Sequence, residues 1–147
     1  MKHLFSIILG LLSFCQLQAQ SWTADNGNGT FTNPLFYDEF TDPDLIRVGT
    51  DFYMVASSMH AMPGLPLLRS KDLVNWEFVT YIFDRLDLGP DFHLEGDKGI
   101  YGNGIWAPAI RYHKGTFYVF VNVNDHGLQV FSACLLYTSP SHETPEH

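Results

Sequence analysis

The chain has 147 residues, enough for one ordinary domain, and its formal net charge is −8. Hydrophobic residues make up 46% of it and charged residues 16%, which is not the composition of a disordered protein. The acidic balance and the lack of a Lys/Arg cluster argue against nucleic acid and anionic membranes as partners. Aromatic residues make up 15%, a share that suits β-strands and stacking platforms for sugar rings.

Residues 1–19 have the layout of a secretory signal peptide, with a basic start, an apolar run over residues 4–15 and the small residue Ala19 at the cleavage point. The run is too short to cross a bilayer comfortably, so we expect no membrane span. A buried N-terminal helix is the alternative. The mature protein is expected to be secreted or periplasmic. Cleavage removes Cys15 and leaves Cys134 alone, so no intramolecular disulfide is expected.

Short strands joined by turns are predicted from residue 35 onward, and no long stretch has helical periodicity. The predicted strands are residues 45–48, 52–57, 67–70, 77–83, 109–113, 116–123 and 128–133. The first two flank the turn Gly49-Thr50-Asp51 and are expected to pair as an antiparallel hairpin. Residues 84–104 hold several glycines and are expected to form a long irregular connection, a common place for functional residues.

An internal repeat relates residues 46–55 to residues 110–120, with Phe52 and Phe117 in corresponding places 65 residues apart. Four-stranded units at such a spacing favour the blades of a β-propeller, and a chance likeness of two hairpins is the alternative. The chain without its signal peptide holds about two such units, whereas a propeller closes with about four to eight blades. Either the propeller interpretation is wrong or the chain is incomplete.

The end of the chain favours incompleteness, because the strand pattern stops at Ala133 and the remaining residues show no alternation. An aberrant tail is expected there, and a natural disordered C-terminus is the alternative. The predicted organisation is a signal peptide at 1–19, the N-terminal part of a propeller at 20–133 and an aberrant or disordered tail at 134–147.

Five short motifs follow one another in a fixed order. They are Asn-Pro-Leu at 33–35, Asp-Pro-Asp-Leu-Ile-Arg-Val-Gly at 42–49, Phe-Tyr at 52–53, Ser-Lys-Asp-Leu-Val-Asn-Trp at 70–76 and Ile-Trp-Ala-Pro at 105–108. As an ordered set they resemble glycoside hydrolase family 43, which includes β-xylosidases and α-L-arabinofuranosidases. The resemblance covers residues 33 to about 133. It implies an all-β fold, the first two or so blades of a truncated five-bladed β-propeller, and a xylan- or arabinoxylan-type oligosaccharide or polysaccharide as substrate.

The resemblance also implies an inverting mechanism, in which one carboxylate activates water as general base and a carboxylic acid about 6.5–9.5 Å away protonates the leaving oxygen. The family's base falls on Asp42. Taken alone, Asp42-Pro43 is only a turn signal. Asp44 is the rival, and we interpret it as a turn or strand-start residue.

The resemblance implies that the general acid, and the aspartate that tunes its pKa, lie well after the motif at Trp106. Glu95-Gly96 lies before that motif and is not assigned, so the chain by itself is expected to lack its general acid and to be inactive. The alternatives are a non-catalytic carbohydrate-binding propeller and a truncated fragment without function.

Three residues are expected to contact the sugar. Trp106 falls at the family position whose indole lines the sugar subsite, where an aromatic face stacks on a pentose, and an indole packed between blades is the alternative. Met59 and His60 follow the second strand, where related β-xylosidases place subsite aromatics, and a solvated histidine is equally consistent with His60.

Leu73 and Trp76 are expected to be buried, with Asp72 capping their turn.

No metal site is assigned. Asp91, His93, Glu95 and Asp97 form an acidic loop without EF-hand or zinc spacing, so we interpret it as solvated. Family members often hold an ion in the central channel, so the resemblance leaves room for a structural calcium in the complete protein. No cofactor is expected for the chemistry.

Overall fold

The computed structural model describes residues 22–59, 62–93, 95–97, 99–100, 102, 104–134 and 141–143. The elements in this part of the chain are β1 (Asp44–Val48), β2 (Asp51–Val55), β3 (Gly64–Ser70), β4 (Trp76–Phe83), the 3₁₀ helix η1 (Pro90–His93), β5 (Ile105–His113), β6 (Thr116–Val123), β7 (Gly127–Ala133) and β8 (Ser141–Glu143). No helix in the described ranges is long and apolar enough to cross a membrane. The predicted signal peptide lies outside these ranges.

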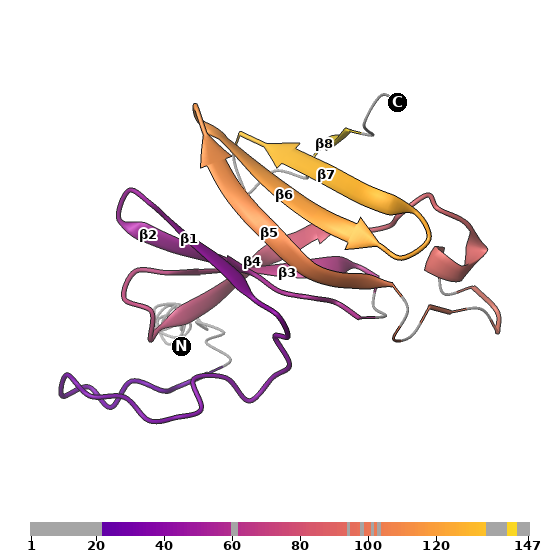
Figure 1. The fold of residues 1–147 in the computed structure, drawn as a ribbon. Helices are drawn as coiled ribbons and strands as arrows, with labels where there is room; N and C mark the ends of the chain where they lie inside the picture. The colour runs from indigo at the N-terminus through magenta and orange to yellow at the C-terminus, as the bar shows by residue number, and fades with distance from the viewer. Residues whose placement is uncertain are drawn as a thin grey trace, which may run out of the picture.

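The strands form two antiparallel sheets in which each strand pairs with the next along the chain (Figure 1). The orders are β1-β2-β3-β4 and β5-β6-β7-β8. The predicted hairpin is confirmed, since Ile46 pairs with Tyr53 and the strands meet at a turn where Gly49 takes a φ of 62°. The repeat is structural as well, because Phe52 and Phe117 each lie in the second strand of their own sheet.

The main core lies between the two sheets, which are stacked on one another in Figure 1. In β6, for example, Phe117, Val119, Val121 and Val123 alternate with less buried residues and all belong to this core, as the two-residue period of a strand requires. Phe83 of β4 stacks on Phe131 of β7 with ring centroids 5.1 Å apart, and Tyr53 of β2 meets Phe117 of β6 edge-on at 5.0 Å. Each fully buried side chain of this size contributes about 1.5–3 kcal/mol, so this layer joins the two sheets into one body.

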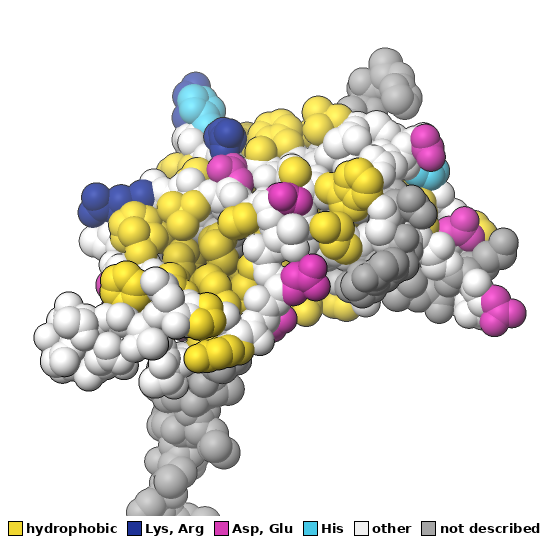
Figure 2. Space-filling model, turned by 60° about the horizontal axis from the view of Figure 1, so that its bottom comes forward, with side chains coloured by type: hydrophobic (Ala, Val, Ile, Leu, Met, Phe, Trp, Pro, Cys, Tyr) yellow, Lys and Arg dark blue, Asp and Glu magenta, His cyan; other side chains and the backbone are white. Residues whose placement is uncertain are grey.

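The opposite face of the β1–β4 sheet is apolar too. Leu45, Met54, Leu68 and Phe78 stand in register across its four strands. The two central residues are buried under aromatic side chains of residues 22–40, whereas Leu45 and Phe78 stay 42% and 46% exposed. In Figure 2 the bottom of the Figure 1 view, where this face lies, is turned toward the viewer, and hydrophobic side chains gather on it.

Two strands begin three or more residues earlier than their sequence pattern indicates. β3 begins at Gly64 rather than residue 67, and β5 begins at Ile105 rather than residue 109. The sequence pattern missed these starts because of Pro66 and Pro108. Proline has no backbone N–H to donate and is therefore rarely expected inside a sheet. In β5 the register shifts between Trp106 and Ala109, so Pro108 sits in a β-bulge where no ladder N–H is needed.

The turn over residues 70–76 is tied by Asp72, whose Oδ1 accepts the backbone N–H groups of Val74 at 2.9 Å and Asn75 at 2.7 Å. The predicted burial of Trp76 is confirmed, since it is 5% exposed and its indole N–H donates to the Leu73 carbonyl at 3.0 Å. The predicted burial of Leu73 is wrong. That residue takes a left-handed φ of 68° to present its carbonyl to the indole, and its side chain is 39% exposed.

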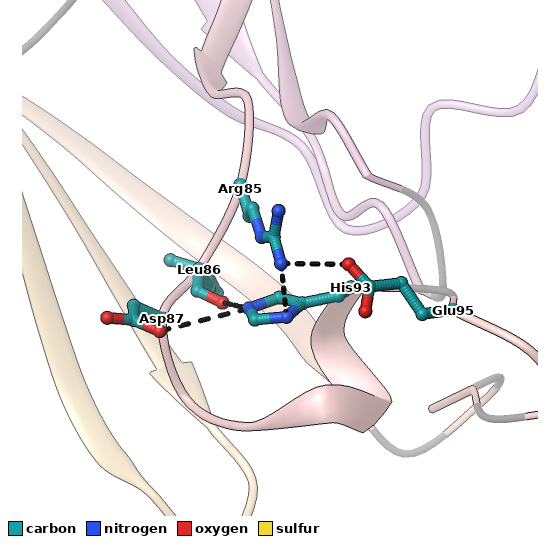
Figure 3. Close-up of polar contacts among 5 residues, drawn as sticks. All are labelled: Arg85, Leu86, Asp87, His93 and Glu95. Carbon is teal, nitrogen blue, oxygen red and sulfur yellow. Dashed lines mark hydrogen bonds and ion pairs between the residues drawn. The ribbon is translucent and has the colours of Figure 1, made fainter.

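Among the described residues of the 84–104 connection, η1 is the one regular element, and His93 at its end contacts other parts of the connection (Figure 3). Arg85 Nη2 lies 2.5 Å from His93 Nδ1 and 3.0 Å from Glu95 Oε1. Because a guanidinium only donates, Nδ1 accepts, and Nε2 then carries the proton that it donates to the Leu86 carbonyl at 3.1 Å. Glu95 of the acidic loop thus forms an ion pair with Arg85.

The last strand lies in the predicted tail. β8 pairs with β7, with Val130 opposite Glu143. Residues 135–140 and 144–147 fall outside the described ranges, so the aberrant or disordered tail stays a prediction.

Candidate active site

A hollow of about 500 Å³ opens where β1 begins, β2 ends and β5 begins. Its lining residues are Glu39, Asp42, Met59, Gly102, Trp106 and Ala107. The fold therefore brings together Asp42, Met59 and Trp106, three of the four residues that the sequence singles out as candidate site residues. The fourth, His60, lies outside the described ranges.

Asp42 stands two residues before β1 in a left-handed conformation, with φ of 48°, which is uncommon for a residue other than glycine. The residue is exposed to solvent. The hydroxyl of Ser57 donates to Asp42 Oδ2 at 3.4 Å. Ser57 is only 5% exposed, and its backbone N–H donates to the Thr41 carbonyl at 2.9 Å.

The same hydroxyl reaches the second sheet. The backbone N–H of Ala107 donates to Ser57 Oγ at 2.7 Å, and Ala107 is also left-handed, with φ of 45°. Ala107 lies in the bulge of β5, directly after Trp106, whose side chain is 40% exposed and lines the hollow. A single buried hydroxyl thus links the carboxylate to the bulge beside the indole.

Asp44 is the first residue of β1, as the sequence suggests, and it faces the second sheet instead of the hollow. Its Oδ2 accepts the backbone N–H of Ile110 at 2.8 Å and an N–H of the Arg111 guanidinium at 2.6 Å. With this oxygen committed to β5, Asp44 acts as a link between the sheets. Asp42 is then the aspartate that lines the hollow in the described part of the chain.

Sequence reasoning missed two residues of this region, Ser57 and Glu39. The hairpin register contains a signal for Ser57: Asp44 pairs with Val55, and extending the pairing by two residues sets Ser57 opposite Asp42. No comparable signal exists for Glu39, because it lies in an irregular segment before β1. It is exposed and accepts the Thr41 hydroxyl at 3.3 Å.

Known proteins resemble this chain in sequence. The model of the family described as glycosyl hydrolases family 43 matches residues 31–144, more than half of the chain. A β-xylosidase of Formosa agariphila is 40% identical over 113 residues, which are 77% of this chain and 19% of that protein. A non-reducing end α-L-arabinofuranosidase of Bacteroides ovatus is 42% identical over 90 residues, 61% of this chain and 16% of that protein. The chain spans about a fifth of the length of the curated relatives that it matches.

Solved structures agree. The bifunctional GH43-CE protein of Bacteroides eggerthii superimposes with a TM-score of 0.67 at 37% identity, over 74% of this chain and 14% of that one. A xylan β-1,4-xylosidase of Bacillus halodurans gives a TM-score of 0.62 at 30% identity, over 75% of this chain and 22% of that one. These neighbours are β-propellers, so the two four-stranded sheets are two propeller blades and the predicted fold class is confirmed. On the family model, the sequence identities and the shared blades together, the chain belongs to family 43 of the glycosyl hydrolases.

Proposed function

We propose that the whole protein that carries this chain hydrolyses glycosidic bonds of xylan- or arabinoxylan-type saccharides with inversion, and that Asp42 is its general base. The observation that carries the proposal is the hollow in which the carboxylate of Asp42 and the exposed indole of Trp106 line the same space. A sugar stacked on the indole would present its anomeric carbon near a water held by the carboxylate. The similar curated proteins are named as xylosidases and arabinofuranosidases, which supports a pentose at this position.

Asp42 is a better base than the other carboxylates near it. Asp44 is bound to the backbone and guanidinium of β5. Glu39 is exposed and contacts the Thr41 hydroxyl of its own segment. Asp42, in contrast, is anchored on one oxygen by a buried hydroxyl and is exposed in the hollow, which is what a base needs to hold and deprotonate one water.

Trp106 is proposed as the stacking platform, and Met59 as an apolar wall on the opposite strand end. Met59 lines the hollow and is half-buried. A pentose has one largely apolar ring face, and the pair of an aromatic and a thioether suits it. His60 follows Met59 in sequence and is proposed as a further sugar contact.

The general acid is proposed to come from outside these 147 residues. An inverting mechanism needs its acid on the other side of the sugar ring, about 6.5–9.5 Å from the base. Glu39 stands only three residues from Asp42 on the same segment, which makes it a poor candidate for the opposite side. Since this chain spans about a fifth of its relatives, further blades have ample room to supply the acid.

The test is turnover by the whole protein on aryl β-xylosides and aryl α-L-arabinofuranosides, with the anomer of the first product followed by NMR. We expect inversion, and we expect Asp42→Asn to lower kcat by about 10²- to 10⁴-fold, the usual range for removal of a general base. Asp44→Asn is the matched control and should retain most of the activity. Retained configuration, or an active Asp42→Asn variant, would refute the mechanism. Binding of xylo-oligosaccharides without turnover would identify a non-catalytic carbohydrate-binding propeller.

Location outside the cytoplasm is part of the proposal. The basic start, apolar run and Ala19 are the features that support secretion or a periplasmic location. N-terminal sequencing of the mature protein tests it, with Gln20 expected as the first residue. A mature protein that still begins at Met1 would contradict it.

A further inference from the structure

We infer that Ser57 is the residue that positions the catalytic carboxylate and couples it to the sugar platform, an inference that rests on the proposed function. We assign Ser57 a positioning role, without a contact of its own to the sugar. It would act through Asp42 on one side and through the bulge at Ala107 on the other.

The protons of this contact can be assigned. A hydroxyl has one proton to donate and lone pairs to accept with. Because the N–H of Ala107 already donates to Ser57 Oγ at 2.7 Å, the proton of Ser57 is available for Asp42 Oδ2, 3.4 Å away. At 5% exposure the hydroxyl has little access to competing water. The two hydrogen bonds therefore run in one direction: Ala107 of the second blade donates to Ser57, and Ser57 donates to the Asp42 carboxylate.

Backbone strain explains why such a tie is needed. Asp42 and Ala107 both hold left-handed φ values, 48° and 45°, which side-chain-bearing residues keep only when surrounding contacts hold them. Ser57 contacts the side chain of one and the backbone of the other. Its own backbone is fixed in turn by its N–H donating to the Thr41 carbonyl at 2.9 Å, directly before Asp42.

The consequence is a division of work between the two carboxylate oxygens. Oδ2 is held by the hydroxyl, which leaves Oδ1 to accept the proton of the attacking water. The 3.4 Å separation is longer than the about 2.7–2.8 Å typical of O–H···O bonds, and catalytic hydrogen bonds commonly shorten once substrate is bound. The same hydroxyl accepts the N–H of Ala107 in the bulge beside Trp106. A sugar stacked on the indole would therefore shorten the hydrogen bond from Ser57 to Asp42.

Kinetics of the whole protein test the inference. We expect Ser57→Ala to lower kcat by ~10- to 100-fold, the usual effect of a reacting group misplaced by about an ångström, and to leave KM within about threefold. The loss should be equal on an aryl glycoside and on the natural oligosaccharide, because a good leaving group relieves a defect in the acid and not one in the base. Ser57→Thr, which keeps the hydroxyl, should recover most of the rate.

Ser58→Ala is the matched control. It removes a neighbouring hydroxyl that makes no hydrogen bond within the described part of the chain, and it should leave kcat unchanged. Equal losses of kcat in the two alanine variants would overturn the inference, because they would report general loosening of this loop.

A double-variant cycle keeps the inference falsifiable if Ser57→Ala lowers the melting temperature. The rates are measured well below the melting temperature. In the Asp42→Asn background, Ser57→Ala should lower kcat no further, because the carboxylate that Ser57 positions is already absent. A full additive loss, or a single Ser57→Ala variant with normal kcat, would refute positioning by Ser57 while Asp42 stays the base. An active Asp42→Asn variant would instead refute the proposed function itself, so the two failures are distinct.

Discussion

Asp44 of β1 and Ile110 of β5 are joined by a hydrogen bond from the Ile110 backbone N–H to Asp44 Oδ2, 2.8 Å long, that crosses from one blade to the next. Arg111 adds an ion pair to the same oxygen at 2.6 Å. The first strands of the two blades are therefore held by a side chain that satisfies an N–H on the edge of the neighbouring sheet.

These two contacts on Asp44 should differ in energy. Arg111 is 60% exposed at its side chain, and exposed ion pairs contribute about 0–1 kcal/mol, so Arg111→Ala should hardly change the free energy of unfolding. Asp44→Ala leaves the N–H of the fully buried Ile110 without its acceptor, a loss of about 1–3 kcal/mol. Denaturant unfolding of the two variants measures this. An equal cost for both would show that the ion pair, not the N–H contact, holds the blades.

Trp106 and Trp76 should respond differently to truncation. Trp106 is 40% exposed, so Trp106→Ala should leave stability nearly unchanged and weaken binding of a xylo-oligosaccharide by about 3- to 10-fold, the loss of one stacking contact. Trp76 is 5% exposed, so Trp76→Ala should cost about 3–5 kcal/mol of stability. Calorimetric titration and thermal melts separate the two effects. Unchanged binding by Trp106→Ala would assign this indole to packing.

The turn over residues 70–76 should weaken in acid. The side-chain hydrogen bond from Asn75, followed by the backbone N–H groups of Asn75 and Val74, lowers the pKa of Asp72 to about 2. A carboxylate with a lowered pKa stabilises the folded state above its unfolded pKa of about 3.9, and this contribution disappears as the pH falls through 2. The stability gap between the wild type and Asp72→Asn should therefore be constant near neutrality and close between about pH 4 and pH 2.

Because Asp72 is exposed, the gap at pH 7 should be below about 1 kcal/mol. Unfolding curves of both proteins at several pH values check this. A gap that persisted at pH 2 would mean that the aspartate stabilises the turn without its charge.

Local patterns predicted the fold well because strands and hairpins are local. The turn at Gly49-Thr50-Asp51 and the repeat of Phe52 at Phe117 were enough to locate two equivalent sheets. The starts of β3 and β5 were missed since proline usually argues against a sheet, and only the bulge reveals why Pro108 is tolerated. Leu73 was misjudged because its backbone serves the Trp76 indole.

The site was predictable as residue types and not as contacts. Family motifs identified Asp42 and Trp106, but the hydrogen bond between Ser57 and Ala107 joins residues 50 positions apart. The contact of Asp44 with Ile110 spans 66. Hydrogen bonds between blades depend on how the two sheets pack in space. The alternation of apolar and polar residues within one strand does not predict them.

A larger residue at Gly64 should destabilise the fold because of Phe83. A Cβ at Gly64 would overlap the ring of Phe83 in the facing strand and stand 3.0 Å from the Ser58 hydroxyl. Both residues sit in a tightly packed layer, where the Phe83 ring is 7% exposed and stacks on Phe131. Overpacking of this kind costs about 1–3 kcal/mol, so Gly64→Ala should lower the free energy of unfolding by that amount.

The cause can be separated from a general intolerance of alanine in β3. Phe83→Leu frees space at the point of overlap, so the double variant Gly64→Ala/Phe83→Leu should be more stable than the sum of the single losses predicts, with a coupling of about 0.5–3 kcal/mol. Thermal or denaturant unfolding of the four proteins gives this coupling. Simple additivity would mean that the cost at Gly64 arises from its backbone and not from the aromatic ring that it faces.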